Sequence, residues 1–186
     1  MGLANWLTVL RIVLIPVFVT LLVYRRPGWA LIVFTVAAFT DLLDGWVARR
    51  RQMASRLGAF LDPLADKLLL TASFVTLTYL RALPFWIAAV VISREVILVV
   101  GALVVHIAGI RIDPRPTRAG KAATFLQIVT VLLGLVSRYA AVEPALVAAM
   151  WLAALFTIYS GCQYLVQGMR FLNTADRDEH EASLHR

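Results

Sequence analysis

Four aspartates stand as two pairs beside the apolar segments of this chain. Asp41 and Asp44 are three residues apart, and Asp62 and Asp66 are four residues apart. Both spacings place the two members of a pair on one face of a helix. A charged side chain inside a bilayer costs about 2.5–3.5 kcal/mol on insertion scales, so a chain this apolar usually keeps one for a function.

Carboxylates that converge in a region of low dielectric repel one another, and a cation must neutralise them. Oxygen ligands suit Mg²⁺ or Mn²⁺, and two such ions form the usual clamp for displacement at phosphorus. We therefore predict a site for two Mg²⁺ or Mn²⁺ ions, with the ligands Asp41, Asp44, Asp62 and Asp66. The plainer alternative is that these residues are interfacial charges at the ends of two helices.

Small and basic residues accompany the aspartates. The small ones would let a bulky ligand approach the helix backbone, and they are Gly45, Ala48 and Gly58. Arg49 can pair with a phosphate group or with an aspartate. This neighbourhood favours a large ligand that contains phosphate.

Six apolar segments must position these residues. Hydrophobic residues make up 61% of the chain, against about 45–50% in a typical soluble domain. A spanning helix needs about 17–25 mostly apolar residues. The segments lie near 8–24, 28–49, 57–80, 84–108, 119–137 and 144–169. We predict an all-α integral membrane protein with six transmembrane helices, in which Pro63 either starts the third helix behind an Asp62 cap or kinks a longer helix.

The distribution of Lys and Arg predicts the orientation. If the N-terminus is cytoplasmic, all but four of the 18 Lys and Arg residues lie on the inner side, as the positive-inside rule requires. The net charge of +7 then belongs to the loops, and we expect no nucleic acid partner. Both termini and the four aspartates would be cytoplasmic. We divide the chain into a membrane domain, 1–172, and a polar tail, 173–186, whose composition predicts disorder.

A resemblance to a known family rests on one continuous pattern, Asp41-x2-Asp44-Gly45-x2-Ala48-Arg49-x8-Gly58-x3-Asp62-x3-Asp66. It resembles the complete signature of the CDP-alcohol phosphatidyltransferase family. The segments NWLTVLRIVLIPVF and GAFLDPLADKLLL are similar to those of phosphatidylglycerophosphate synthases and of cardiolipin synthases that use CDP-diacylglycerol. The resemblance implies a six-helix bundle, usually a homodimer, in a bacterial inner membrane with its active site facing the cytoplasm.

The resemblance also implies a reaction and residue roles. A phosphatidyl group would pass from CDP-diacylglycerol to an alcohol acceptor, with release of CMP. Asp66 would be the base that takes the proton of the acceptor hydroxyl. The CDP moiety would bind at Gly45, Ala48, Arg49 and Gly58.

Three basic residues are our candidates for binding a phosphate group of the acceptor. Arg94 and its neighbour Glu95 lie inside an apolar run, where an ionisable residue is a functional hypothesis by default. A pair of Arg and Glu that compensates its own charge is the structural alternative. Arg118 and Lys121 are three residues apart at the start of the fifth segment, where cations favour a phosphate ligand. Ordinary positive charge of a cytoplasmic loop is the alternative there.

The residues that would select the acceptor favour two different molecules. Relatives that use glycerol 3-phosphate typically carry a second lysine where this chain has Thr124, and an arginine where it has Ala102. These departures favour phosphatidylglycerol, the acceptor of cardiolipin synthases, and inositol phosphate also stays open. The broader likeness favours glycerol 3-phosphate, which we predict.

A membrane cation transporter is the alternative from a different class of protein. Secondary transporters usually show paired repeats with broken helices at the midplane of the membrane. Here the acidic cluster occurs in one half of the chain only, which favours the enzyme.

Overall fold

The computed structural model describes the backbone of residues 3–51, 56–107 and 117–184, and the side chains of residues 9–40, 67–101, 103, 117–166 and 168. Within these residues, helix is the only regular secondary structure, which confirms the all-α class. The helices are α1 (Leu3–Val23), α2 (Pro27–Arg51), α3 (Arg56–Tyr79), α4 (Phe85–Ile107), α5 (Arg118–Val136) and α6 (Glu143–Leu184). All six correspond to the six apolar segments.

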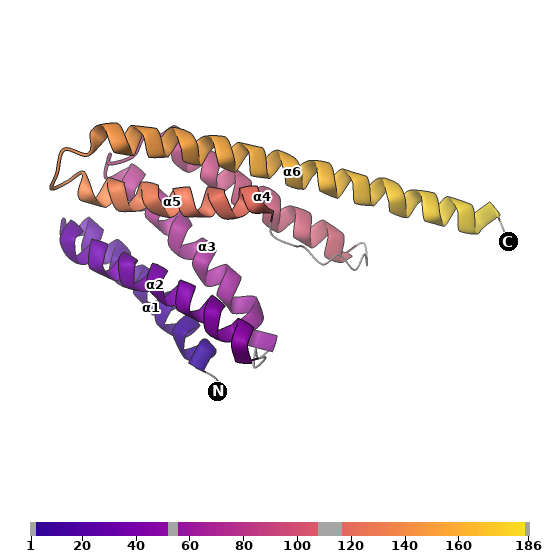
Figure 1. Ribbon diagram of the computed structural model, residues 1–186, viewed down its shortest axis with the longest axis horizontal. Coiled ribbons are helices and arrows are strands. Elements are labelled where there is room, and N and C mark those ends of the chain that lie inside the picture. The colour runs from indigo at the N-terminus through magenta and orange to yellow at the C-terminus, as the bar shows by residue number, and fades with distance from the viewer. Residues whose placement is uncertain (1–2, 52–55, 108–116, 185–186) are drawn as a thin grey trace.

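The helices run alternately up and down the bundle. In Figure 1, α2 and α4 end, and α1, α3 and α5 begin, toward the same end of the molecule, which we name the aspartate end. The closest packing joins α5 to α6, α1 to both α2 and α3, and α4 to α6. Helix α3 also touches α4 and α5, and α2 touches α5, so α2 and α3 together join the first three helices to the last three. The fold thus brings the motif-bearing ends of α2 and α3 and the first turn of α5 to one end.

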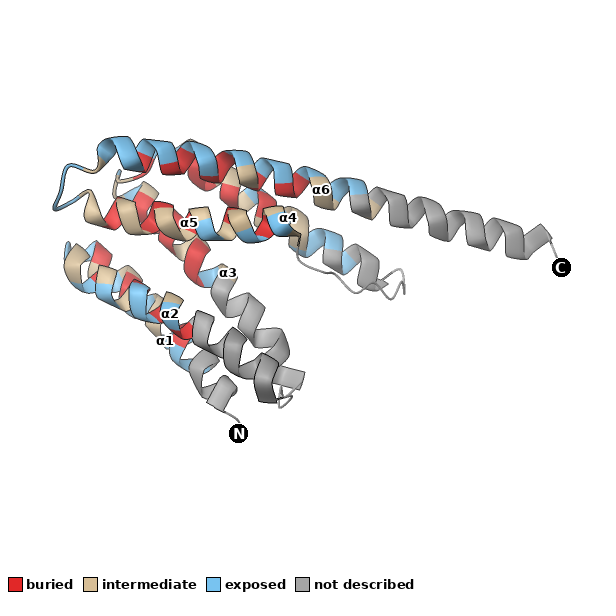
Figure 2. Cartoon of the chain, in the orientation of Figure 1, coloured by how far each residue is buried: buried red, intermediate tan, exposed pale blue. Residues whose placement is uncertain are grey.

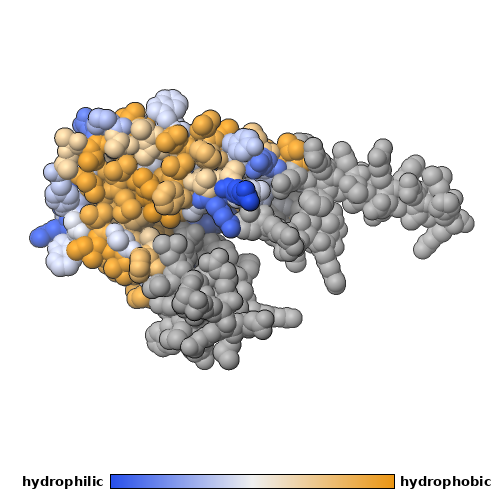
Figure 3. Space-filling view, in the orientation of Figure 1, coloured by the Kyte–Doolittle hydropathy of each residue, from blue (hydrophilic) through white to orange (hydrophobic). Residues whose placement is uncertain are grey.

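Apolar side chains fill the interior and also cover the outside. Phe18 of α1 and Phe34 of α2 are fully buried, with ring centroids 5.7 Å apart. Yet Phe125 and Trp151 are 65% and 64% exposed. Exposed positions run along the outer sides of the helices (Figure 2), and apolar residues cover much of the visible face (Figure 3). A soluble helix normally shows a polar face to water, and soluble proteins rarely expose apolar patches larger than a few hundred Å². An apolar exterior of this kind suits a lipid surrounding.

By length and composition, two helices among the described residues could cross a membrane unaided. They are Arg118–Val136 and Glu143–Val166. Shorter apolar stretches occupy Val9–Val23, Pro27–Thr40 and Lys67–Tyr79. Six spans remain a prediction.

Two details differ from what the sequence predicts or leaves open. Helix α3 begins at Arg56, so Pro63 lies within it and does not start it behind an Asp62 cap. Helix α6 continues to Leu184, whereas the composition of residues 173–186 predicts disorder. No proline or glycine follows Gly168, so no strong helix breaker stands in this segment. The division into domain and tail stays a prediction.

Helices α1 and α3 end in the same unusual turn, at the end of the bundle opposite to the aspartate end. The amide of Arg25 donates to the carbonyl of Leu22 (3.0 Å) and that of Arg26 to Leu21 (2.8 Å), which is the Schellman pattern. Arg25 takes the left-handed conformation, with φ 55°, at the position where glycine is usual. The end of α3 repeats the pattern around Arg81, with φ 57°.

Candidate active site

The aspartate motif lies on the last part of α2 and the first part of α3. Asp41 and Asp44 belong to α2, whereas Asp62 and Asp66 belong to α3. The spacing within each helix and the meeting of the two helices at one end suit a set of converging oxygen ligands. The side chains of the motif lie outside the described ones, namely those of Asp41, Asp44, Gly45, Ala48, Arg49, Gly58, Asp62 and Asp66. Their roles therefore stay predictions.

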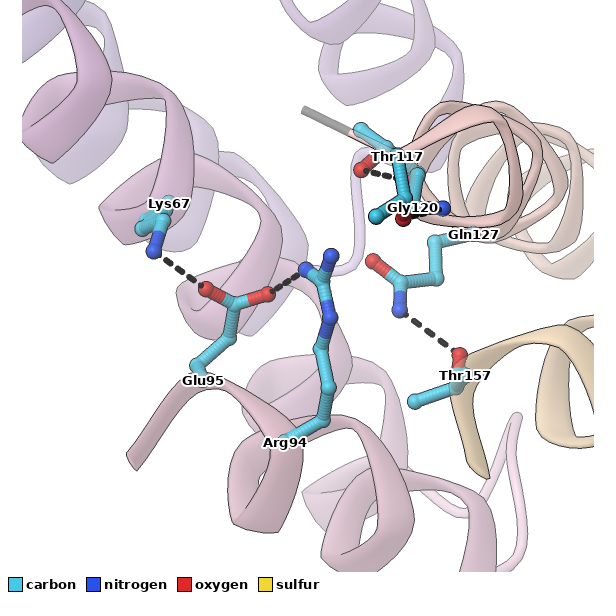
Figure 4. A network of polar contacts seen from close by, with 8 residues as sticks. Lys67, Arg94, Glu95, Thr117, Gly120, Gln127 and Thr157 are labelled. Atoms are coloured by element: carbon cyan, nitrogen blue, oxygen red, sulfur yellow. Dashed lines mark hydrogen bonds and ion pairs between the residues drawn. The ribbon is translucent and has the colours of Figure 1, made fainter. Parts of the chain in front are cut away.

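A network of charged side chains begins one residue after the motif. Lys67, the neighbour of Asp66, places its Nζ 3.1 Å from Oε2 of Glu95, in an ion pair without hydrogen-bond geometry. The other carboxylate oxygen of Glu95 accepts a hydrogen bond from Nη1 of Arg94 (Figure 4). The side chains of Arg94 and Glu95 are only 9% and 13% exposed. An Arg–Glu pair that compensates its own charge was the alternative to a binding role for Arg94, and the structure contains this pair. Lys67 of α3 also pairs with Glu95, so the carboxylate contacts two cations.

The guanidinium group of Arg94 reaches from α4 to the place where α5 and α6 meet. A Cβ atom built on Gly120 of α5 would lie 3.4 Å from Nη2 of Arg94 and 3.3 Å from Oγ of Ser160 on α6. Glycine at position 120 permits this close approach. Thr117 caps α5 at the same point, where its Oγ1 accepts a hydrogen bond of 3.0 Å from the amide of Gly120.

Several buried polar atoms around Arg94 have no partner within the described part of the chain. They are Nε of Arg94, Oε1 of Gln127 and Oγ of Ser160. Gln127 is fully buried between α5 and α6, where its Nε2 donates to Oγ1 of Thr157 (2.9 Å). An unsatisfied buried polar group costs about 1–3 kcal/mol, and in native proteins it usually has a specific reason. We therefore treat this cluster as part of a polar binding region.

Neither Thr157 nor Ser160 is among the site residues predicted from the sequence. Thr157 and Ser160 are polar residues three positions apart within the apolar run AALFTIYSG, so they share one face of α6. That spacing was the available signal, although it does not say which helix they face.

Arg118 and Lys121 lie on the first turn of α5, beside the buried cluster. Both side chains are exposed, and neither has a partner among the described residues. The N-terminal end of a helix also carries a partial positive charge, which favours an anion nearby. The structure thus brings Arg94, Arg118 and Lys121 to one region, with Arg94 buried and the other two at the surface.

Shallow hollows in the described part lie at the opposite end of the bundle. One of about 400 Å³ is lined by Arg25, Arg26, Gly28, Trp29, Ile32 and Tyr139. Another of about 500 Å³ is lined by residues 78 and 81–85. None of the predicted site residues lines them. No group of three or more His, Cys, Asp or Glu able to hold a metal occurs among the described side chains, so the aspartate motif stays our candidate metal site.

Comparison with known proteins agrees with the resemblance carried by the motif. Residues 1–159 match the model of a family of membrane enzymes, the CDP-alcohol phosphatidyltransferases. The chain is 36% identical over 178 residues to a probable phosphatidylglycerophosphate synthase of Mycobacterium tuberculosis, covering 91% of this chain and 82% of the relative.

Two further relatives are both named CDP-diacylglycerol–glycerol-3-phosphate 3-phosphatidyltransferase. The relative from Bacillus subtilis is 32% identical over 193 residues, covering 94% of this chain and 99% of the relative. The relative from Escherichia coli (strain K12) is 39% identical over 168 residues, covering 86% of this chain and 90% of the relative. Extended matches of this kind confirm the resemblance, and the chain belongs to the CDP-alcohol phosphatidyltransferase family.

Proposed function

We propose that the protein transfers the phosphatidyl group of CDP-diacylglycerol to glycerol 3-phosphate and releases CMP. The agreement of the relatives carries the proposal, since proteins 32–39% identical over at least 86% of the chain bear names for this one reaction. Membership in a family of transferases disfavours the cation transporter. The absence of a second lysine at Thr124 still favours phosphatidylglycerol as the second candidate acceptor.

The motif residues would carry the chemistry at the aspartate end. Two Mg²⁺ or Mn²⁺ ions, bound by the four aspartates, would neutralise the diphosphate of the donor. Asp66 takes the proton of the acceptor hydroxyl, whose oxygen forms a bond to the phosphorus that bears diacylglycerol. The bond from that phosphorus to the bridging oxygen breaks, and CMP leaves. Gly45, Ala48 and Gly58 leave room for the CDP moiety, while Arg49 pairs with phosphate.

Arg94, Arg118 and Lys121 would bind the phosphate of glycerol 3-phosphate. Arg94 offers a buried Nε that has no partner among the described residues, and the two exposed cations lie on the first turn of α5. A phosphomonoester carries close to two negative charges at neutral pH, so it gains more than a phosphodiester does from several charge-assisted hydrogen bonds.

An acceptor panel tests the proposal. Purified protein is given CDP-diacylglycerol and Mg²⁺ with glycerol 3-phosphate, phosphatidylglycerol or inositol phosphate, and the lipid products are identified by mass. We expect phosphatidylglycerophosphate and equimolar CMP from glycerol 3-phosphate. Formation of cardiolipin from phosphatidylglycerol, with glycerol 3-phosphate left unused, would identify the second candidate as the correct one.

The proposed site requires a defined orientation in a bacterial inner membrane. We propose six spans, a homodimer, and an active site and both termini on the cytoplasmic side, as the distribution of Lys and Arg predicts. A reporter that is active only in the cytoplasm, fused after residue 186, should be active. A matched fusion between Ala140 and Val142, in the α5–α6 connection, should be inactive. The reverse pattern would contradict this orientation.

A further inference from the structure

We infer that Glu95 is a positioning residue for the acceptor, because its carboxylate holds Arg94 and Lys67 in one fixed arrangement. The inference rests on the proposed function, which assigns Arg94 to the phosphate of the acceptor. It concerns a residue that neither the motif nor the family match assigns to a role. The network in Figure 4 supplies the observations.

The geometry of the pair constrains the guanidinium group. Consecutive residues on a helix point about 100° apart, so adjacency alone does not bring Arg94 and Glu95 together. The hydrogen bond from Nη1 of Arg94 to Glu95 therefore selects one side-chain conformation. In that conformation Nε has no partner among the described residues, and Nη2 lies beside Gly120. An arginine has five N–H donors, so donors remain for a ligand.

The balance of charge around Glu95 suits an anionic ligand. Among the described side chains, two cations, Arg94 and Lys67, share one carboxylate, which leaves one positive charge in excess. Arg94 and Glu95 are largely buried, whereas Lys67 is 36% exposed. A lone buried cation would carry a large desolvation cost, which a nearby carboxylate reduces. Glu95 thus keeps the two cations in place before the acceptor binds, and a phosphate group would balance the remaining charge.

The ion pair also connects the two halves of the proposed reaction. Lys67 directly follows Asp66, the predicted base on α3, whereas Arg94 is the predicted phosphate ligand on α4. Glu95 contacts both cations. It therefore fixes the turn that carries the base relative to the residue that binds the acceptor, and small errors in such placement cost rate.

Substitution of Glu95 tests the inference through the two Michaelis constants. Glu95→Gln keeps the size of the side chain and removes its charge. We expect the KM for glycerol 3-phosphate to rise about tenfold, as for the loss of one hydrogen bond to a charged group, with the KM for CDP-diacylglycerol almost unchanged. Glu95→Asp keeps the charge, so its KM for glycerol 3-phosphate should lie between that of Glu95→Gln and that of the wild type. The matched control is Glu143→Gln, an exposed glutamate at the opposite end, which should change neither constant.

A steric variant tests the placement of Arg94 without changing any charge. Gly120→Ala puts a methyl group 3.2 Å from Oγ1 of Thr117 and 3.3 Å from Oγ of Ser160, so these two neighbours must give by a few tenths of an ångström. The same methyl group lies 3.4 Å from Nη2 of Arg94 and fills the space beside the guanidinium group. Gly120→Ala should therefore raise the KM for glycerol 3-phosphate. Gly101→Ala is the control, because a Cβ there would meet nothing within 4 Å.

The outcomes separate this inference from the function on which it rests. If the wild-type protein does not use glycerol 3-phosphate, both the proposed function and the positioning role of Glu95 are wrong. If the wild-type protein uses glycerol 3-phosphate but Glu95→Gln leaves both turnover and the KM for glycerol 3-phosphate unchanged, only the positioning role is wrong. A lower melting temperature together with equal changes in both constants shows a purely structural role, and also overturns it. If Glu95→Gln does not fold, Glu95→Asp decides by the same comparison.

Discussion

Asp44→Asn and Asp62→Asn should each lower turnover at least about a hundredfold without unfolding the protein. Asparagine has the size of aspartate, but it loses the charge that a divalent ion requires from an oxygen ligand. Removal of a single group that stabilises charge in the transition state commonly costs about 10²–10³ in rate. The measurement is CMP release at saturating concentrations of both substrates, with circular dichroism to verify helix content.

Divalent ions supply the control for this prediction. A chelator should abolish wild-type activity, and Mg²⁺ or Mn²⁺ should restore it. An ion that binds only the folded protein also raises its melting temperature, so Mg²⁺ should stabilise the wild type more than either variant. Turnover close to that of the wild type in Asp44→Asn or Asp62→Asn would remove the assignment of these residues as metal ligands.

Lys121→Ala should raise the KM for glycerol 3-phosphate by roughly 10- to 150-fold. The range corresponds to about 1.5–3 kcal/mol, the contribution of a hydrogen bond to a charged group. Lys121 is exposed on the first turn of α5, so its removal leaves no buried cavity. The measurement is initial rate as a function of each substrate in turn, and we expect the KM for CDP-diacylglycerol to change little.

Arg26→Ala is the matched control for Lys121→Ala. It removes one exposed cation at the opposite end of the bundle, where the proposed acceptor does not bind. It should leave both Michaelis constants unchanged. If Lys121→Ala also leaves them unchanged, or raises both equally, Lys121 does not bind the acceptor.

Hydropathy predicted the positions of the helices well, because each helix contains one long apolar run. The second segment was expected at 28–49, and α2 spans Pro27–Arg51. The largest differences lie at the two ends of the chain. Helix α1 begins at Leu3, before the run that was expected from 8, and α6 passes beyond 169 to Leu184. Polar residues can extend a helix beyond its apolar part, so hydropathy does not mark such ends.

Contacts between helices could not be read from the sequence. The aspartate motif was recognisable because its spacing is local, within two neighbouring segments. The contact of Lys67 with Glu95 joins residues 28 positions apart, and that of Gln127 with Thr157 joins residues 30 apart. Such contacts depend on the rotation and register of packed helices, which no local pattern records. The pairing of Arg94 with Glu95 was foreseen as an alternative, but the participation of Lys67 was not.

The two left-handed arginines have a consequence for how stability is distributed in this protein. A residue other than glycine in that conformation costs about 1–2 kcal/mol, so Arg25 and Arg81 each keep a folded backbone under strain. Both lie far from the aspartates, at the end where the proposed reaction has no requirement. Enzymes often lose activity when they are made more heat-resistant, because the strain removed belonged to the active site. Here the strain at Arg25 and Arg81 lies outside the proposed active site. Relieving it could therefore make the protein more heat-resistant without a loss of activity.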